Sequence, residues 1–250
     1  MTAARTATEG LNSEIAVSLE TTSGRVFVKG RPVGRSATTQ RREAAINPYV
    51  RHLAPRLLWQ ARTGSWDLLG FEHAPGSHAD YAPGSRHLGV VVDVLRQLGT
   101  TQCPEQPEVR NAEQRWSEHL DDPGTAELFA GETLLHTDFN PLNLLIHGDT
   151  TRIVDWAWPT RGAAFIDPAC WIVRLIAAGH SARSADAWAR QCPEYAAAPS
   201  HATALFALAT CRMWNEIAQH EPAPWKRHMA IAASRWLAYT GTTVDVGPRD

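Results

Sequence analysis

The chain has 250 residues, of which 44% are hydrophobic and 20% are charged, a composition that is ordinary for a globular protein. Its formal net charge of -2 excludes the strongly basic surface typical of a nucleic-acid-binding protein. No apolar run approaches the roughly 20 residues that span a bilayer, and the first residues lack the apolar core of a signal peptide, so we expect a cytoplasmic protein without a membrane partner.

The predicted elements change in character along the chain. Alternating apolar and polar residues in the first third predict strands, with one short helix among them. Further on, apolar residues recur mainly at helical spacing. In chain order we expect a frayed start at 1–9, strands at 15–19 and 25–29, a helix at 40–50, strands at 57–60 and 66–72, helices at 85–97 and 108–120, strands at 133–136, 144–147 and 152–154, and helices at 167–179, 183–191, 200–219 and 225–239.

Strands that come before helices predict a segregated α+β protein rather than alternating βαβ units. The composition changes at 74–77, where Ala, Pro, Gly and Ser follow one another. This change predicts a boundary between a small β-rich lobe at 1–74 and a larger helical lobe at 75–250.

Four polar residues in the middle of the chain suggest a chemistry. His136 and Asp138 form an H-x-D pattern, Asn143 follows five residues after Asp138, and Asp155 follows a short apolar strand. Phosphoryl transfer needs a carboxylate that orients the attacking hydroxyl and accepts its proton, and Asp138 fits this role. It also needs hard oxygen ligands for Mg²⁺, which Asn143 and Asp155 can supply.

This stretch resembles the catalytic loop of the aminoglycoside phosphotransferase family, a branch of the protein-kinase-like superfamily. The family patterns are H-G-D-x-x-x-x-N and a metal-binding I-D-W or I-D-F, and Thr137 stands here where Gly is common. The resemblance implies that Asp138 is the catalytic base and His136 a structural support. It also implies that Asn143 and Asp155 are Mg²⁺ ligands.

Two more segments bear on this interpretation. Asp167 lies in a stretch similar to the family's G-D-P-A-x-D segment, and the resemblance implies that it braces the catalytic loop. His147-Gly148-Asp149 spells H-G-D, but Val154, five residues after Asp149, is not an Asn. Because Gly148 and Asp149 lie between two apolar runs, we predict a hairpin turn there.

The first lobe is expected to hold the nucleotide. Lys29 is one of only two lysines beside 22 arginines, and it ends a predicted strand where kinase-like proteins have their phosphate-binding Lys. Glu43, on the predicted helix, is placed to pair with it. The Gly-Leu-Asn-Ser-Glu segment looks like the family's short phosphate loop, so Ser13 is expected to approach a phosphate. The resemblance also assigns adenine contacts to the backbone of Glu72 and Ala74.

The resemblance implies a two-lobed kinase-like fold and an ATP- and Mg²⁺-dependent phosphotransferase that modifies a hydroxyl of an antibiotic-like, sugar-like or nucleoside-like small molecule. One alternative is a metabolite kinase of the choline type, because acceptor choice has no common motif. A second is a non-catalytic kinase-like binding or regulatory module. A third, a metal-dependent hydrolase built on His136, Asp138, His147 and Asp149, leaves Asn143 and Lys29 unexplained. The sequence does not distinguish ATP from GTP.

The acceptor is expected to bind among the last helices of the chain. Residues 170–240 contain four acidic and seven basic residues, a balance of +3. This sign disfavours a polycationic aminoglycoside and favours a neutral or weakly charged hydroxylated compound. The same region holds five Trp, most of which are expected to fill the helical core.

Overall fold

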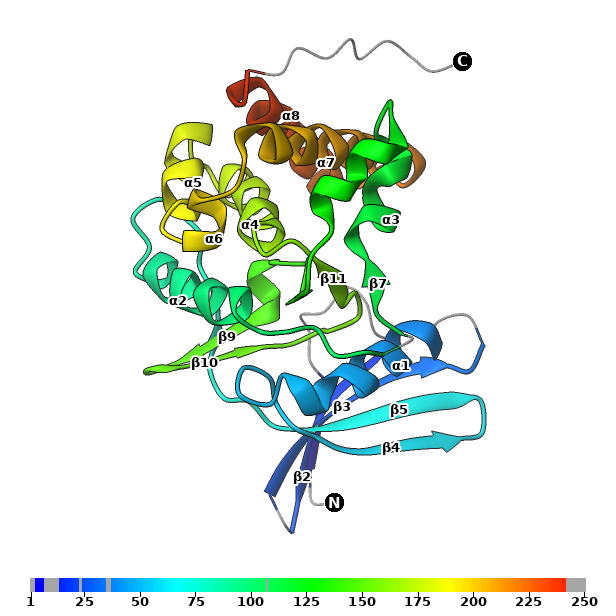
Figure 1. Ribbon diagram of the computed structural model, residues 1–250. Helices are drawn as coiled ribbons and strands as arrows, with labels where there is room; N and C mark the ends of the chain where they lie inside the picture. The colour runs from blue at the N-terminus through cyan, green and yellow to red at the C-terminus, as the bar shows by residue number, and fades with distance from the viewer. Residues whose placement is uncertain (1–2, 7–13, 23, 35–36, 107, 242–250) are drawn as a thin grey trace. The chain divides into compact units, whose positions relative to one another are not determined.

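The computed structural model describes residues 3–6, 14–22, 24–34, 37–106 and 108–241. Packing within the chain divides it into two compact units, and Figure 1 labels most of their helices and strands. The first unit comprises 1–79, 104–109 and 140–159, and the second comprises 80–103, 110–139 and 160–250. Within the described ranges, no helix combines the length and the hydropathy needed to cross a bilayer.

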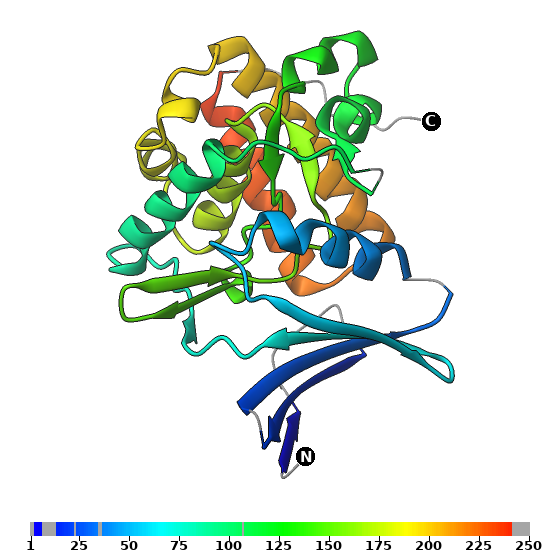
Figure 2. The same cartoon turned by 60° about the horizontal axis from the view of Figure 1, so that its bottom comes forward.

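The first unit is built on a five-stranded antiparallel sheet with the strand order β1-β2-β3-β5-β4. Gly24, with φ +121°, is the first residue of β3, and Gly64, with φ +54°, lies between β4 and β5. Figure 2 shows helix α1 lying along this sheet. The bounds are β1 (Ala3–Thr6), β2 (Ile15–Thr21), β3 (Gly24–Pro32), α1 (Ala37–Ile46), the 3-10 turn η1 (Asn47–Tyr49), β4 (Leu57–Thr63) and β5 (Trp66–Glu72).

The two residues expected to bind metal, Asn143 and Asp155, flank the hairpin of a small second sheet in the first unit. Strands β9 (Leu144–His147) and β10 (Thr150–Ile153) form a hairpin that pairs with β6 (Ser77–His78), after the 3-10 turn η4 (Pro141–Asn143). Gly148 has φ +55° in the two-residue connection, so the predicted hairpin turn is confirmed. The Ile153 N–H donates to the Leu53 carbonyl at 2.7 Å and ties the hairpin to an earlier part of the chain.

The second unit is mainly helical. Helix α4 packs against α5 and α8, and α8 packs against α7. Phe206 of α7 makes edge-to-face contacts with Trp116, Phe129, Phe165 and Trp236, which form the aromatic centre of the core. The bounds are α2 (His87–Gly99), α3 (Ala112–Trp116), η2 (Ser117–His119), η3 (Pro123–Phe129), α4 (Ile166–Ala177), α5 (Ala182–Ala189), α6 (Pro193–Ala196), α7 (Ser200–His220) and α8 (Pro224–Tyr239).

A three-stranded sheet, β7-β11-β8, accompanies these helices, with β7 at Arg110–Asn111, β8 at Thr133–Leu135 and β11 at Thr160–Gly162. The α+β class, with a β-rich first part and a helical last part, is confirmed. Two local predictions are wrong. The helix expected at 108–120 is shortened because 110–111 pair with β11 in parallel, and the expected frayed start contains β1, which pairs with β2.

Candidate active site

Lys29 lies at the centre of a buried ion cluster in the first unit. Strand β3, which carries it, runs between β2 and β5, and the Lys29 side chain is only 11% exposed. Its Nζ contacts Glu43 Oε2 at 2.7 Å and Asp155 Oδ1 at 2.8 Å. Helix α1 supplies Glu43, and the segment after β10 supplies Asp155. The predicted Lys29–Glu43 pair is therefore present, and a second carboxylate completes it.

The charges of this cluster depend on one another. Burial disfavours the charged form of Lys29, but the carboxylates of Glu43 and Asp155 outweigh it and raise the pKa of Lys29 above its ordinary value of 10.5. Burial raises the pKa of Glu43, although Lys29 opposes this shift. Lys29 therefore carries its positive charge throughout the physiological pH range.

Asn143 and Asp155 are brought together by the β9–β10 hairpin. The Val154 N–H donates to the Asn143 carbonyl at 2.9 Å, and Asp155 follows with φ +63°, a left-handed conformation that Asp tolerates better than most residues. The next residue, Trp156, is buried and its N–H donates to Glu43. Carboxylate and amide oxygens are the donors that Mg²⁺ prefers, so the two side chains have the chemistry of magnesium ligands.

Three more residues, Ser13, Glu72 and Ala74, are expected to bind the nucleotide. Ser13 lies outside the described residues. Glu72 ends β5, and its N–H donates to the Arg56 carbonyl at 2.9 Å, so an adenine contact at Glu72 would use its carbonyl group. Its exposed carboxylate pairs with the Arg56 side chain at 2.9 Å. Ala74 follows in irregular chain just after the strand.

The backbone of the loop that carries Asp138 is hydrogen-bonded to Asp167, and both lie in the second unit. Asp167 is buried at the first turn of α4, and its two carboxylate oxygens accept from the N–H groups of His136 at 2.9 Å and Thr137 at 2.7 Å. His136 in turn accepts from the Asp138 N–H through Nδ1 at 3.2 Å. Burial raises the pKa of Asp167, and these hydrogen bonds oppose that shift. The contacts are those expected of a brace and a structural support.

Two arginines of the second unit were missed by the sequence analysis. Arg174 Nη2 contacts Asp138 Oδ1 at 2.7 Å, and Arg115 Nη1 donates to Thr137 Oγ1 at 2.6 Å. Arg174 had a usable signal, because it follows Asp167 by seven residues and two helical turns place both on one face of α4. Arg115 had none, because it lies on a helix of five residues.

No family model and no curated protein matches the chain. Solved structures do match it. The aminoglycoside phosphotransferase APH(4)-Ia superposes with a TM-score of 0.61 at 14% identity, over 97% of this chain and 95% of its own. The macrolide 2'-phosphotransferase MphH from Brachybacterium faecium gives 0.52 at 18% identity, over 92% and 91%. The choline kinase LicA from Streptococcus pneumoniae gives 0.62 at 12% identity, over 95% and 94%.

This chain has the kinase-like fold of the aminoglycoside phosphotransferases. The residues predicted from the sequence to form the site are divided between the two units. Lys29, Glu43, Asn143 and Asp155 belong to the first unit, and Asp138 belongs to the second together with its supports His136 and Asp167.

The tryptophans of this kinase-like chain differ in exposure. Trp171 and Trp236 are fully buried, as expected of core residues, whereas Trp225 is 40% exposed and Trp214 is half-buried. Trp214 and Trp225 contact each other edge to face at 6.1 Å. Arg174 lies 5.6 Å from the Trp214 ring centre. Lys226, expected on the surface, is largely covered; it pairs with Glu221 and lies 5.5 Å from the Trp225 ring centre.

Proposed function

We propose that this protein is an ATP-dependent phosphotransferase that moves the γ-phosphate of ATP to a hydroxyl of a small molecule. The observation that carries the proposal is the buried Glu43–Lys29–Asp155 cluster on a kinase-like fold. In active kinases the strand Lys must be paired with the helix Glu before phosphoryl transfer proceeds. A nucleotide site is further supported by the APH(4)-Ia structures, which include a complex with AMP-PNP and hygromycin B.

In the proposed mechanism, Lys29 contacts the phosphates of ATP and Glu43 keeps the ammonium group in place. Asn143 and Asp155 hold Mg²⁺. When bound, Mg²⁺ neutralises charge on the phosphate oxygens. Because Asp155 already contacts Lys29 at 2.8 Å, the chain has a cation and an oxygen ligand next to each other before the nucleotide arrives.

Asp138 is the proposed base. It accepts the proton of the acceptor hydroxyl while that oxygen bonds to the γ-phosphorus and the bond from phosphorus to the leaving ADP oxygen breaks. The proton ends on Asp138, and the products are ADP and a phosphate ester. Asp138 precedes Asn143 by five residues, which limits their separation to about 18 Å of extended chain.

The acceptor is proposed to be a neutral or weakly charged hydroxylated compound, antibiotic-like, sugar-like or nucleoside-like. Among the similar structures, two kinds are complexes with hygromycin B or streptomycin, and two others are a macrolide phosphotransferase and a choline kinase. Here one face of Trp214 and one of Trp225 already meet the cations of Arg174 and Lys226. These contacts disfavour a quaternary ammonium acceptor, because such a cation would compete with Arg174 and Lys226 for the same aromatic faces. The choline-type alternative is therefore the weaker one.

The first test is thermal unfolding with ATP or GTP, each with and without Mg²⁺. A ligand at about 100 times its Kd adds about 2.7 kcal/mol, which raises the Tm of a protein of this size by about 5–10 °C. We expect such a rise with Mg²⁺ and nucleotide in the wild type and in the control Asp149→Asn, whose side chain lies in the exposed hairpin turn. Asp155→Asn is expected to abolish the Mg²⁺-dependent part.

The second step is a screen of hydroxylated compounds for phosphorylation, followed by Asp138→Asn. This variant is expected to keep the Mg²⁺-nucleotide rise in Tm and to lose about 100-fold or more in kcat, the contribution typical of a general base. Wild-type turnover in Asp138→Asn would show that the base is another group. Absence of any rise in Tm with either nucleotide would instead favour the non-catalytic binding module.

A further inference from the structure

Thr137, the residue before Asp138, has φ +65°. In the described part of the chain, Thr137 and Asp155 are the two non-glycine residues with positive φ. A β-branched residue is a clear outlier in this region, because its Cβ substituents crowd the backbone. Such a conformation persists only where surrounding contacts fix it, and it is typical of functional loops.

The contacts at Thr137 come from two directions. Its N–H donates to Asp167 Oδ1 at 2.7 Å, and its Oγ1 accepts from Arg115 Nη1 at 2.6 Å. Asp167 holds the backbone and would hold a glycine at position 137 equally well. The hydroxyl contact is different, because a glycine has no group to offer Arg115. The side chain of Thr137, despite its strain, therefore has a specific partner.

Arg115 links this hydroxyl to another segment. The same Nη1 donates to Thr160 Oγ1 on β11 at 2.9 Å, and the guanidinium lies 4.6 Å from the centre of the Trp116 ring. Thr160 is fully buried, so the contact is sheltered from water. Burial also lowers the pKa of Arg115 to about 10, which remains far enough above neutrality to keep the guanidinium charged.

We propose that Arg115, Thr137 and Thr160 form a latch that fixes the orientation of Asp138. Arg115 and Thr137 act as positioning residues, since they touch the loop and not the reacting atoms. The latch joins α3, β11 and the residue beside Asp138 through one guanidinium, so rotation of the 136–138 backbone requires that a buried charge lose a hydrogen bond. The effect of the latch on catalysis rests on the function proposed above for Asp138. The hydrogen bonds of the latch do not depend on that proposal.

Three substitutions at one position separate the possible roles of Thr137. Thr137→Ser keeps the hydroxyl and removes the methyl group. Thr137→Val keeps the branched shape and removes the hydroxyl, and Thr137→Gly removes both the strain and the hydroxyl. If backbone conformation alone mattered, Gly would equal or exceed the wild type. If the latch matters, Ser resembles the wild type, whereas Val and Gly share a defect.

The first measurement needs no activity. Thermal unfolding of Arg115→Met, Thr137→Val and the double variant forms a cycle that measures their coupling. We expect each single variant to lower the Tm by about 6 °C and the double variant by little more than one of them. Hydrogen exchange at the amides of 136–138 is expected to accelerate about 10-fold or more in Thr137→Val and to stay near wild type in Thr137→Ser. Additive Tm losses with unchanged exchange would overturn the latch.

The second measurement is turnover with an acceptor found in the screen. Thr137→Ser is expected to keep kcat within about 2-fold, and Thr137→Val and Thr137→Gly are expected to lower it about 10-fold while the KM for Mg²⁺-ATP changes less than about 2-fold. Wild-type kcat in Thr137→Gly would refute the positioning role even if the coupling is present. If the coupling is present but the screen finds no acceptor and no nucleotide raises the Tm, the latch stands and the proposed enzyme is refuted instead.

Discussion

At the scale of single residues, Lys29 gives a stability prediction with a definite pH dependence. Its pKa is raised in the folded state, so its ion pairs contribute stability that is fully present below about pH 10.5 and is lost as the pH rises through the folded-state pKa. Lys29→Met leaves Glu43 and Asp155 without their shared cation and should lower the free energy of unfolding by about 3 kcal/mol. Urea unfolding of both proteins should show a constant difference from about pH 7 to 10 that shrinks above it.

The other lysine of the chain is the matched control. Lys226 pairs with Glu221, whose side chain is 75% exposed, so water screens the interaction. Lys226→Met should therefore change the free energy of unfolding much less than Lys29→Met. If both variants lost the same free energy of unfolding, the buried cluster would stabilise the protein no more than an exposed ion pair does.

The sequence was enough to predict those site residues that lie in a local pattern of recognisable secondary structure. Lys29, Glu43 and Asp167 could be placed because a strand, a helix and a loop of recognisable pattern carry them. Arg115 could not be assigned from the sequence, because 22 arginines share the chain and only packing brings this one to Thr137. The seven-residue spacing of Arg174 from Asp167 places both on one face of α4, but it does not reveal the contact of Arg174 with Asp138. The positive φ of Thr137 is likewise a product of tertiary contacts, since the local preference of Thr opposes it.

At the scale of elements, the pairing of β4 with β5 depends on a glycine. A Cβ at Gly70 would lie 2.2 Å from the Trp59 ring, so the indole of the edge strand occupies the space that a side chain would need. Gly70→Ala should displace Trp59 and lower the free energy of unfolding by about 1–3 kcal/mol. In a Trp59→Ala background the same change should be nearly neutral, which chemical denaturation of the four proteins would reveal.

A helical glycine provides the control for this prediction. Gly89 is exposed within α2, and a Cβ there would meet nothing within 4 Å. Gly89→Ala should stabilise the protein by about 0.5–1 kcal/mol, because Ala loses less backbone entropy in a helix. If Gly70→Ala also stabilised the protein, the close approach of Trp59 would have no energetic weight.

The long helices and most strands were predicted well, but three of the shortest strands, β6, β7 and β11, were not. The helices at 166–177, 200–220 and 224–239 repeat apolar residues over several turns, and the structure contains them near the expected bounds. Strands β6, β7 and β11 have two or three residues, too few to show a period. They exist because partners elsewhere in the chain accept their hydrogen bonds, and such pairing also shortened the helix expected at 108–120.

At the scale of the whole molecule, the order of strands and helices was enough to predict the fold class, but not which segments pack together. Residues 140–159, far along the chain, group with the first sheet through contacts such as Ile153 to Leu53. The hydrogen bond joins residues 100 positions apart, and no local pattern records it. Long-range pairing of this kind is selected by the packing of the whole chain.

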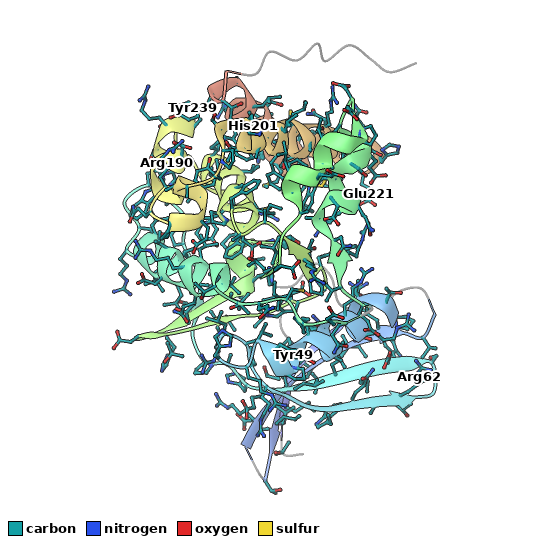
Figure 3. All side chains as sticks on the ribbon, in the orientation of Figure 1. Tyr49, Arg62, Arg190, His201, Glu221 and Tyr239 are labelled. Atoms are coloured by element: carbon teal, nitrogen blue, oxygen red, sulfur yellow. The ribbon has the colours of Figure 1, made fainter. Side chains whose placement is uncertain are left out.

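Charge is the whole-molecule property that bears on the acceptor. Several carboxylates of the second unit already contact a basic side chain, and Figure 3 shows Arg190 and Glu221 on opposite sides of that unit. These pairs include Asp138 with Arg174, Asp186 with Arg190, Asp121 with Arg212 and Glu221 with Lys226. Carboxylates in such pairs attract a polycation less, since a nearby cation offsets each one.

We therefore predict that kcat/KM is about 10-fold or more higher for a neutral hydroxylated acceptor than for a polycationic aminoglycoside of similar size at low salt. The gap should narrow at about 0.2 M salt, because screening weakens the repulsion of a polycation. Arg227 and Arg235 are exposed on α8, and Arg227→Glu with Arg235→Glu changes the balance of 170–240 from +3 to -1. This double variant should raise kcat/KM for the polycation and leave that for the neutral acceptor unchanged. A polycation that is preferred by the wild type, with a preference that falls as salt rises, would mean that local carboxylates near Asp138 outweigh the charge of the unit.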